Sequence, residues 1–152
     1  MKQAIENRVV LISGLPGSGK TTLVINFLNQ YKIDNIYVPF SKDIDRNRNL
    51  LKKIFSFIHV RGLDYLNIDD FMSDIYSSSL KLLREISSNF SRFVIVFDNF
   101  DEVINNKVIT EFIKILISNC PPNISICIIS RETLIENNTF PDIMLYQINY
   151  SD

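Results

Sequence analysis

Residues 14–21 combine glycine, lysine and threonine at a spacing suited to phosphate. The segment reads Gly-Leu-Pro-Gly-Ser-Gly-Lys-Thr and fits the pattern G-x-x-x-x-G-K-[ST]. Glycines let backbone N–H groups curl around an anion, and a helix that starts directly after them adds the positive end of its dipole. Lys20 would reach the β- and γ-phosphates, and Thr21 would hold Mg²⁺. The pattern predicts a nucleotide-binding P-loop, with contacts assigned to Gly14, Pro16, Gly17, Ser18, Gly19, Lys20, Thr21 and Thr22.

A second candidate lies at the end of the apolar run Phe-Val-Ile-Val-Phe, which is followed by Asp98. Such a run is typical of a strand buried on both faces of a parallel sheet. Ligands of open α/β sheets bind at the carboxyl ends of the strands, so Asp98 is expected to face the same crevice as the P-loop. We predict that Asp98 holds Mg²⁺ together with Thr21, as a Walker B carboxylate does.

The residue after this carboxylate bears on hydrolysis. Asn99 carries an amide, which can orient a water molecule but cannot take its proton as a carboxylate can. Asp101 or Glu102 could act as the base instead, or they could cap the next helix or face solvent. The sequence therefore supports nucleotide binding better than hydrolysis.

The elements that must position these residues alternate along the chain. Apolar β-branched runs predict strands over residues 8–13, 36–39, 92–97, 124–130 and 144–150. Helical spacing predicts helices over 20–30, 49–60 and 106–119, and another that is capped by Asp69 or Asp70 and ends at residues 87–89. This order predicts an α/β fold with a mostly parallel sheet.

Composition narrows the class of protein. The chain has 152 residues, of which 46% are hydrophobic and 22% charged, so we expect one globular domain. The net charge of −1 argues against binding nucleic acid by charge alone, and a basic stretch around residues 46–61 is expected to be a solvated helix face. Cys120 and Cys127 are too few for a zinc site or a disulfide framework. His59, the only histidine, is expected to be structural, and no membrane segment or secretory signal is predicted.

Taken together, the P-loop, FVIVFDN-F-DEV, ISICIIS-RE and residues 144–151 resemble the AAA+ domain of the fifth subunit of the eukaryotic origin recognition complex. The resemblance implies a P-loop NTPase of AAA+ type over residues 1–152, a three-layer α/β/α fold with a five-stranded, mainly parallel sheet. It places Ser130 as sensor 1 and groups Asp98, Asn99 and Ser130 as the residues nearest the chemistry. Many AAA+ ATPases have glutamate where Asn99 stands, whereas this subunit typically varies there.

The chain also departs from that family. Its last strand keeps Tyr-Ser but lacks the preceding Phe-Pro. Only 13 residues precede Gly14, so we expect most of the usual N-terminal initiator segment to be missing. The sequence stops where the helical lid with its sensor 2 arginine would begin. Arg131 could contact phosphate, reach a neighbouring subunit's nucleotide, or lie in solvent.

The resemblance implies a function as well. It suggests a nuclear protein that binds ATP and Mg²⁺ beside other AAA+ subunits of the complex, and that reaches origin DNA through them. Nucleotide would stabilise the ring, with weak or no hydrolysis. ATP is favoured over GTP chiefly by the resemblance, since the sequence has no Asn-Lys-x-Asp tetrad. The alternatives are a hydrolysing AAA+ or signal-transduction ATPase, a small P-loop kinase and a scaffold with an empty P-loop.

Overall fold

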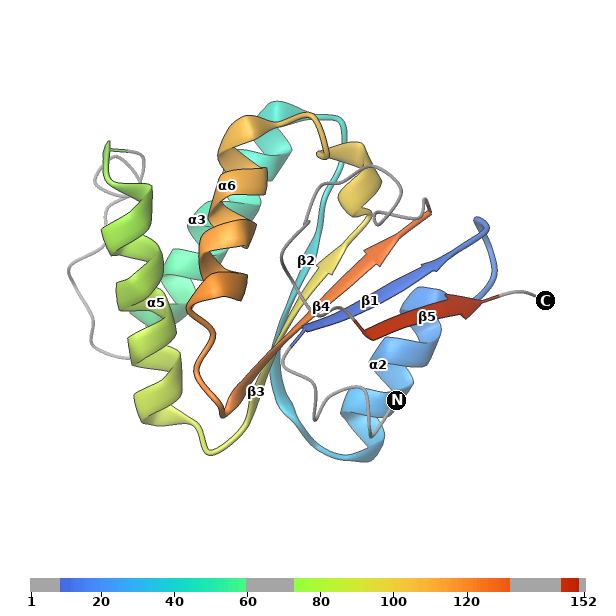
Figure 1. The fold of residues 1–152 in the computed structure, drawn as a ribbon, viewed down its shortest axis with the longest axis horizontal. Coiled ribbons are helices and arrows are strands. Elements are labelled where there is room, and N and C mark those ends of the chain that lie inside the picture. Colours follow the sequence, from blue (N-terminus) through green and yellow to red (C-terminus); the bar gives the residue numbers. More distant parts are fainter. Residues whose placement is uncertain (1–8, 60–72, 132–145, 151–152) are drawn as a thin grey trace.

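The computed structural model describes residues 9–59, 73–131 and 146–150. Strands and helices alternate along the chain, as the sequence predicts (Figure 1). The strands are β1 (Val9–Gly14), β2 (Asp34–Pro39), β3 (Phe93–Asp98), β4 (Ile124–Ser130) and β5 (Tyr146–Tyr150). The helices are α2 (Lys20–Gln30), α3 (Ile44–His59), α5 (Ile75–Asn89) and α6 (Lys107–Ser118), with a short 3₁₀ helix η1 (Phe100–Glu102).

One sheet of five strands, in the order β2-β3-β4-β1-β5, forms the centre of the molecule. Every neighbouring pair is parallel, which confirms the predicted α/β fold. Because all strands run the same way, their carboxyl ends meet at one edge of the sheet. The P-loop follows β1, Asp98 ends β3 and Ser130 ends β4, so all three predicted motifs come to that edge.

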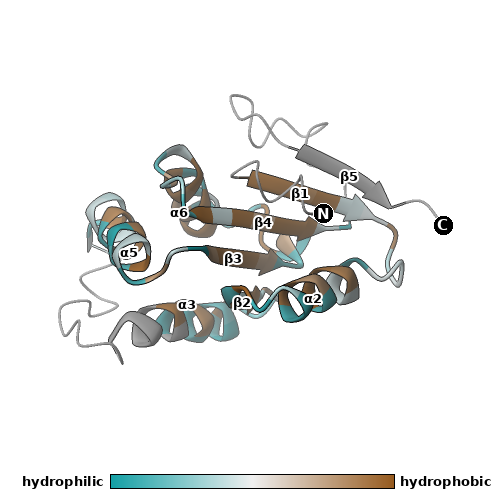
Figure 2. Cartoon of the chain, turned by 90° about the horizontal axis from the view of Figure 1, so that it is seen from below, coloured by the Kyte–Doolittle hydropathy of each residue, from teal (hydrophilic) through white to brown (hydrophobic). Residues whose placement is uncertain are grey.

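Helices cover both faces of the sheet and complete the predicted three layers. On one face α2 packs Val24, Phe27 and Leu28 against the alternate residues Val10 and Ile12 of β1. On the other face, apolar side chains of α3, α5 and α6 form the larger core with β1, β3 and β4. Figure 2 shows these three strands as brown, hydrophobic segments, in keeping with strands that are buried on both faces.

The alternation of side chains along β3 determines on which face of the sheet its last residue, Asp98, lies. Successive residues of a strand point to opposite faces, so Val94, Val96 and Asp98 share one face. Val94 and Val96 belong to the core on the α2 side, which places the Asp98 carboxylate on that side as well. On the opposite face, Phe97 stacks on Phe40 with ring centroids 5.7 Å apart, and this packing fixes the end of the strand beside the site.

Two helices begin elsewhere than predicted. Helix α3 starts at Ile44 rather than at residue 49, because Asp43 Oδ1 accepts hydrogen bonds from the N–H groups of Asp45 (2.9 Å) and Arg46 (3.1 Å). Helix α5 starts after Asp74, whose side chain accepts from the N–H of Ser77 at 3.0 Å. The predicted caps Asp69 and Asp70 lie outside the described residues.

Both cysteines are buried, and neither forms a disulfide. Burial raises the pKa of Cys127 to about 12, so its thiol stays protonated and unreactive. Within the part of the chain that the structure describes, no helix is long and apolar enough to cross a membrane.

Candidate nucleotide-binding site

The carboxyl edge of the sheet holds a cavity of about 690 Å³. This volume lies within the range of about 300–1,000 Å³ that small-molecule and cofactor sites occupy. Four segments supply its walls: the P-loop with the first turn of α2, the β2–α3 connection, the turn after β3, and the end of β4. Most of the predicted site residues line it, namely Pro16, Gly17, Gly19, Lys20, Thr21, Thr22, Asp98, Asn99 and Ser130.

The P-loop owes its shape to two glycines. Gly17 and Gly19 have φ values of 78° and 84°, a left-handed conformation that residues with a side chain rarely adopt. A Cβ on either glycine would meet no atom within 4 Å, so the space beside them is open. Gly19 also caps α2 without a side-chain hydrogen bond, and the first turn of α2 has no acidic residue. The first N–H groups of α2 are therefore suited to an anion.

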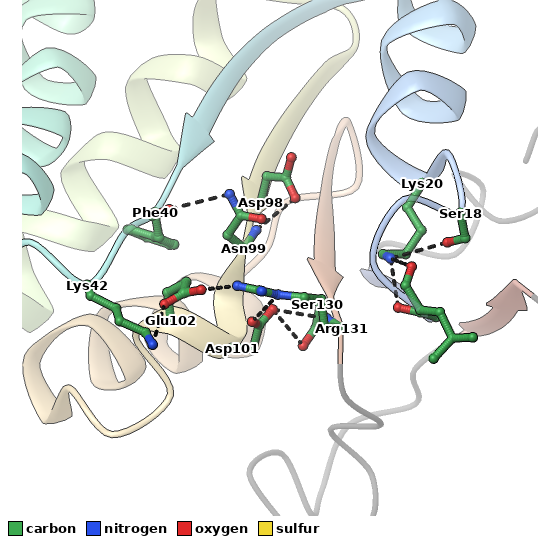
Figure 3. Close-up of polar contacts among 12 residues, drawn as sticks. Ser18, Lys20, Phe40, Lys42, Asp98, Asn99, Asp101, Glu102, Ser130 and Arg131 are labelled. Atoms are coloured by element: carbon green, nitrogen blue, oxygen red, sulfur yellow. Dashed lines mark hydrogen bonds and ion pairs between the residues drawn. The ribbon is translucent and has the colours of Figure 1, made fainter.

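Lys20 folds back over the loop. Its ammonium donates hydrogen bonds to the carbonyl oxygens of Gly14 and Leu15, both at 2.7 Å, and to Ser18 Oγ at 3.3 Å (Figure 3). These bonds match the three donors of an ammonium group. All three acceptors are neutral, so the positive charge is solvated but not cancelled.

Asp98 is the buried anion of the site, with 3% of its surface exposed. Its Oδ2 accepts from Thr21 Oγ1 at 2.7 Å and from the Tyr37 hydroxyl at 2.5 Å, and its Oδ1 accepts from the N–H of Asn99 at 2.7 Å. The structure thus joins the two predicted Mg²⁺ residues directly. These hydrogen bonds offset the cost of burying the charge.

Tyr37 was not among the predicted site residues. Burial and the neighbouring Asp98 carboxylate raise the pKa of Tyr37 above its usual range, so its hydroxyl is protonated and acts as the donor. The contact depends on the pairing of β2 with β3, where Tyr37 lies opposite Val96. The contact between Tyr37 and Asp98 could have been predicted from the sequence only if the strand order had been known.

The turn after β3 forms a second charged group. Arg131 donates through Nε to Asp101 Oδ2 at 2.8 Å and through its backbone N–H to Asp101 Oδ1 at 2.9 Å, and it also pairs with Glu102 (Figure 3). The expectation that Asp101 and Glu102 cap the next helix or face solvent is wrong. Asn106 caps α6 instead, and the two carboxylates have side chains only 11% and 15% exposed. Arg131 is an ion-pair partner of both carboxylates, and its side chain is also 43% exposed.

Ser130 and Asn99 lie where β4 ends and directly after β3. Ser130 is buried at the end of β4, with its hydroxyl 3.5 Å from Asp101 Oδ1. Asn99 is in the left-handed region with φ of 54°, and its amide Nδ2 lies 3.5 Å from the carbonyl oxygen of Phe40. Both line the cavity, and their predicted roles toward the nucleotide stay predictions.

The β2–α3 connection and the first turn of α3 supply lining residues that were not predicted, namely Phe40, Ser41 and Lys42 from the connection and Arg46 from the helix. A buried Asn47 holds the connection, because its side chain accepts from the N–H of Ser41 (3.0 Å) and donates to the carbonyl of Ser41 (2.7 Å). Pro39, which ends β2, could have signalled this wall, since residues after a parallel strand lie at the carboxyl edge.

The donor set suits Mg²⁺ when it arrives with a nucleotide. Among the described residues there is no group of three or more His, Cys, Asp or Glu side chains that could hold a metal alone. Mg²⁺ normally keeps several waters and takes one or two protein oxygens together with phosphate oxygens. The adjoining Thr21 hydroxyl and Asp98 carboxylate supply such oxygens, so these residues fit the ion.

Comparison with known proteins agrees with this architecture. The fold is similar to that of the Orc1 protein of Aeropyrum pernix, solved in complex with DNA, with a TM-score of 0.64 and 16% sequence identity. The match covers 93% of this chain but only 39% of that one, so it bears on the fold alone. No curated protein sequence matches this one. Residues 5–133 match the AAA domain family, and the chain therefore belongs to the AAA domain family of P-loop proteins.

Proposed function

We propose that this protein is an ATP-binding AAA+ subunit of a DNA-replication origin recognition complex, in which nucleotide stabilises the ring and is hydrolysed weakly or not at all. Membership of the AAA domain family implies nucleotide binding, typically with Mg²⁺. Two likenesses support the finer assignment: the sequence motifs shared with the fifth subunit, and a fold similar to that of an Orc1 protein solved with DNA. The proposal includes residues 1–152 as the AAA+ core, a nuclear location, partner AAA+ subunits, and origin DNA reached through the complex.

One observation carries the proposal. The side of the site proposed to bind phosphate has the expected lysine, threonine and aspartate, whereas the side that would activate water lacks the expected glutamate. Lys20 and Thr21 line the cavity beside the glycine loop, and Asp98 adjoins Thr21 at 2.7 Å. At the next position Asn99 has no basic group, and Arg131 engages the two carboxylates that follow.

Binding follows from the charges of the loop. Lys20 is surrounded by neutral oxygens, and a phosphate offers it a full opposite charge in a partly dry site, where Coulomb attraction is stronger than in water. Backbone N–H groups at the start of α2 add the partial positive charge of the helix end. Thr21 and Asp98 would hold Mg²⁺, which neutralises phosphate charge when bound.

Weak hydrolysis follows from the environment of the remaining carboxylates. A general base must reach the proton of the attacking water and be free to accept it. Asp101 accepts two hydrogen bonds from Arg131, and Glu102 pairs with the same guanidinium. Carboxylate oxygens that accept hydrogen bonds from arginine are not free to take a proton from water, so neither residue replaces the missing glutamate.

One observation favours the alternative of a hydrolysing ATPase. Glu102 lines the cavity, and its Oε2 accepts no hydrogen bond among the described residues, although the Lys42 ammonium lies 3.9 Å away. A rearrangement that separated Glu102 from Arg131 would put a base into the cavity.

One pair of measurements distinguishes the proposed subunit with weak or no hydrolysis from the hydrolysing ATPase. The chain is titrated with ATP in the presence of Mg²⁺ by calorimetry, and phosphate release is then followed under saturating ATP. Tight binding with no release above the rate of Lys20→Ala supports the proposal. Brisk release by the isolated chain would contradict it and favour the hydrolysing alternative.

A further inference from the structure

Tyr37 contacts the candidate site from outside the cavity. It lies in β2 opposite Val96 of β3, and side chains two residues apart on a strand share a face, so its ring is directed toward Asp98. The hydroxyl donates to Asp98 Oδ2 at 2.5 Å. Tyr37 is not among the described residues that line the cavity, and it therefore acts through Asp98 rather than on a ligand.

Three donors fix the Asp98 carboxylate, and each comes from a different element. Thr21 belongs to α2, the Asn99 N–H to the turn after β3, and Tyr37 to β2. Thr21 and Tyr37 share Oδ2, so their two hydrogen bonds set the direction of that oxygen. Because Asp98 is 3% exposed, little water is available to replace a lost donor.

We propose that Tyr37 is a positioning residue for Mg²⁺, holding Asp98 Oδ2 toward Thr21 so that the carboxylate and the hydroxyl act on one ion. The inference rests on the proposed nucleotide binding. Hydrogen-bond partners of the groups around a metal orient those groups, and their loss typically weakens metal binding by about 10- to 100-fold. Two side chains donate to Asp98, and of these Thr21 is a proposed Mg²⁺ ligand whereas Tyr37 is not.

The ring of Tyr37 offers a clean way to separate this role from packing. The residue is 37% exposed, so its ring is only partly packed, and phenylalanine keeps the ring while it removes the hydroxyl. Tyr76 provides a matched control, because it is 55% exposed on α5 and that helix packs on the opposite face of the sheet from α2 and Asp98.

The experiment measures the Kd for ATP with Mg²⁺ and again with EDTA, for wild type, Tyr37→Phe and Tyr76→Phe. Tyr37→Phe is expected to weaken binding about tenfold with Mg²⁺ and to leave the EDTA value unchanged. Tyr76→Phe is expected to change neither. A purely structural role for Tyr37 would move both Kd values together, and that result, or no change in either, would overturn the inference.

Two further arms keep the outcome clear. If wild type binds ATP in neither condition, the proposed nucleotide binding fails, whereas an unchanged ratio of the two Kd values in a wild type that binds ATP sinks only the role of Tyr37. Proton NMR of the wild type needs no variant. The Tyr37 hydroxyl proton is expected to stay protected from exchange with water in the Mg²⁺–ATP complex, and fast exchange there would overturn the inference.

Discussion

The two charged sides of the cavity differ in how their cations are held. On the P-loop side, the Lys20 ammonium contacts two carbonyl oxygens and a hydroxyl, all of them neutral. On the side formed by η1 and the end of β4, the Arg131 guanidinium contacts the carboxylates of Asp101 and Glu102 (Figure 3). Both cations line the same cavity.

This difference bears on phosphate binding and on hydrolysis in opposite ways. A cation that is solvated by dipoles keeps its full charge for an incoming phosphate. A cation paired with two carboxylates has its charge balanced locally, and those carboxylates already accept hydrogen bonds from it. The P-loop side is therefore suited to attract an anion. On the acidic side, formed by Asp101, Glu102 and Arg131, the charges are paired with one another.

The largest expected effect removes the cation of the P-loop side. When nucleotide is present at about 100 times its Kd, binding should stabilise wild type by about 2.7 kcal/mol. Lys20→Ala should lose this gain completely, because the ammonium is the charge that phosphate meets. Thermal melts with and without ATP and Mg²⁺ measure it, with Lys114→Ala on the surface of α6 as the control. A melting shift with ATP that survives Lys20→Ala would contradict the assignment of the site.

The next largest effect supplies the missing base. Asn99→Glu places a carboxylate directly after Asp98, on the wall of the cavity. General bases typically contribute about 10²-fold or more, so phosphate release should rise by about 10²-fold while the Kd for ATP changes little. Asn99→Gln is the matched control, since it has the same length without basicity. Equal rates for the two variants would mean that turnover is limited by something other than a base.

A smaller effect breaks the acidic side. Arg131→Ala leaves two largely buried carboxylates without their arginine, and a buried group left unpaired costs about 1–3 kcal/mol. We expect a loss of about 1–2 kcal/mol in the free energy of unfolding, measured in urea without nucleotide. The exposed Arg92→Ala is the control. Equal stability of Arg131→Ala and Arg92→Ala would show that the cluster contributes nothing.

The sequence predicts the P-loop side of this comparison well, because the information there is local. Glycine in the loop, lysine after it and apolar runs in β1 and β3 each depend on neighbours along the chain. The alternation of strands and helices indicates a parallel sheet, and a parallel sheet brings strand ends to one edge. From these features alone Lys20, Thr21 and Asp98 could be placed together.

The acidic side and Tyr37 could not be placed in this way, because their contacts depend on the strand order. The sheet puts β3 between β2 and β4, so Tyr37, Asp98 and Arg131, which directly follows β4, come together although they are far apart in sequence. Nothing in the local pattern says that Arg131 turns toward η1 rather than toward the loop. The capping expectation for Asp101 and Glu102 failed for the same reason: a tertiary partner outweighed a local one.

The smallest expected effect tests whether burial decides the strength of the pairing. Lys42 approaches the same Glu102 at 3.9 Å, but its side chain is 87% exposed, and exposed ion pairs contribute between about 0 and 1 kcal/mol. Lys42→Ala should cost less than about 0.5 kcal/mol in wild type, because Arg131 still neutralises Glu102. In the Arg131→Ala background Lys42 becomes the nearest cation, so its removal should cost more there. Urea unfolding of the two single variants and the double variant measures this coupling. Purely additive losses would mean that the two cations act on Glu102 independently, and that the acidic side is not one cluster.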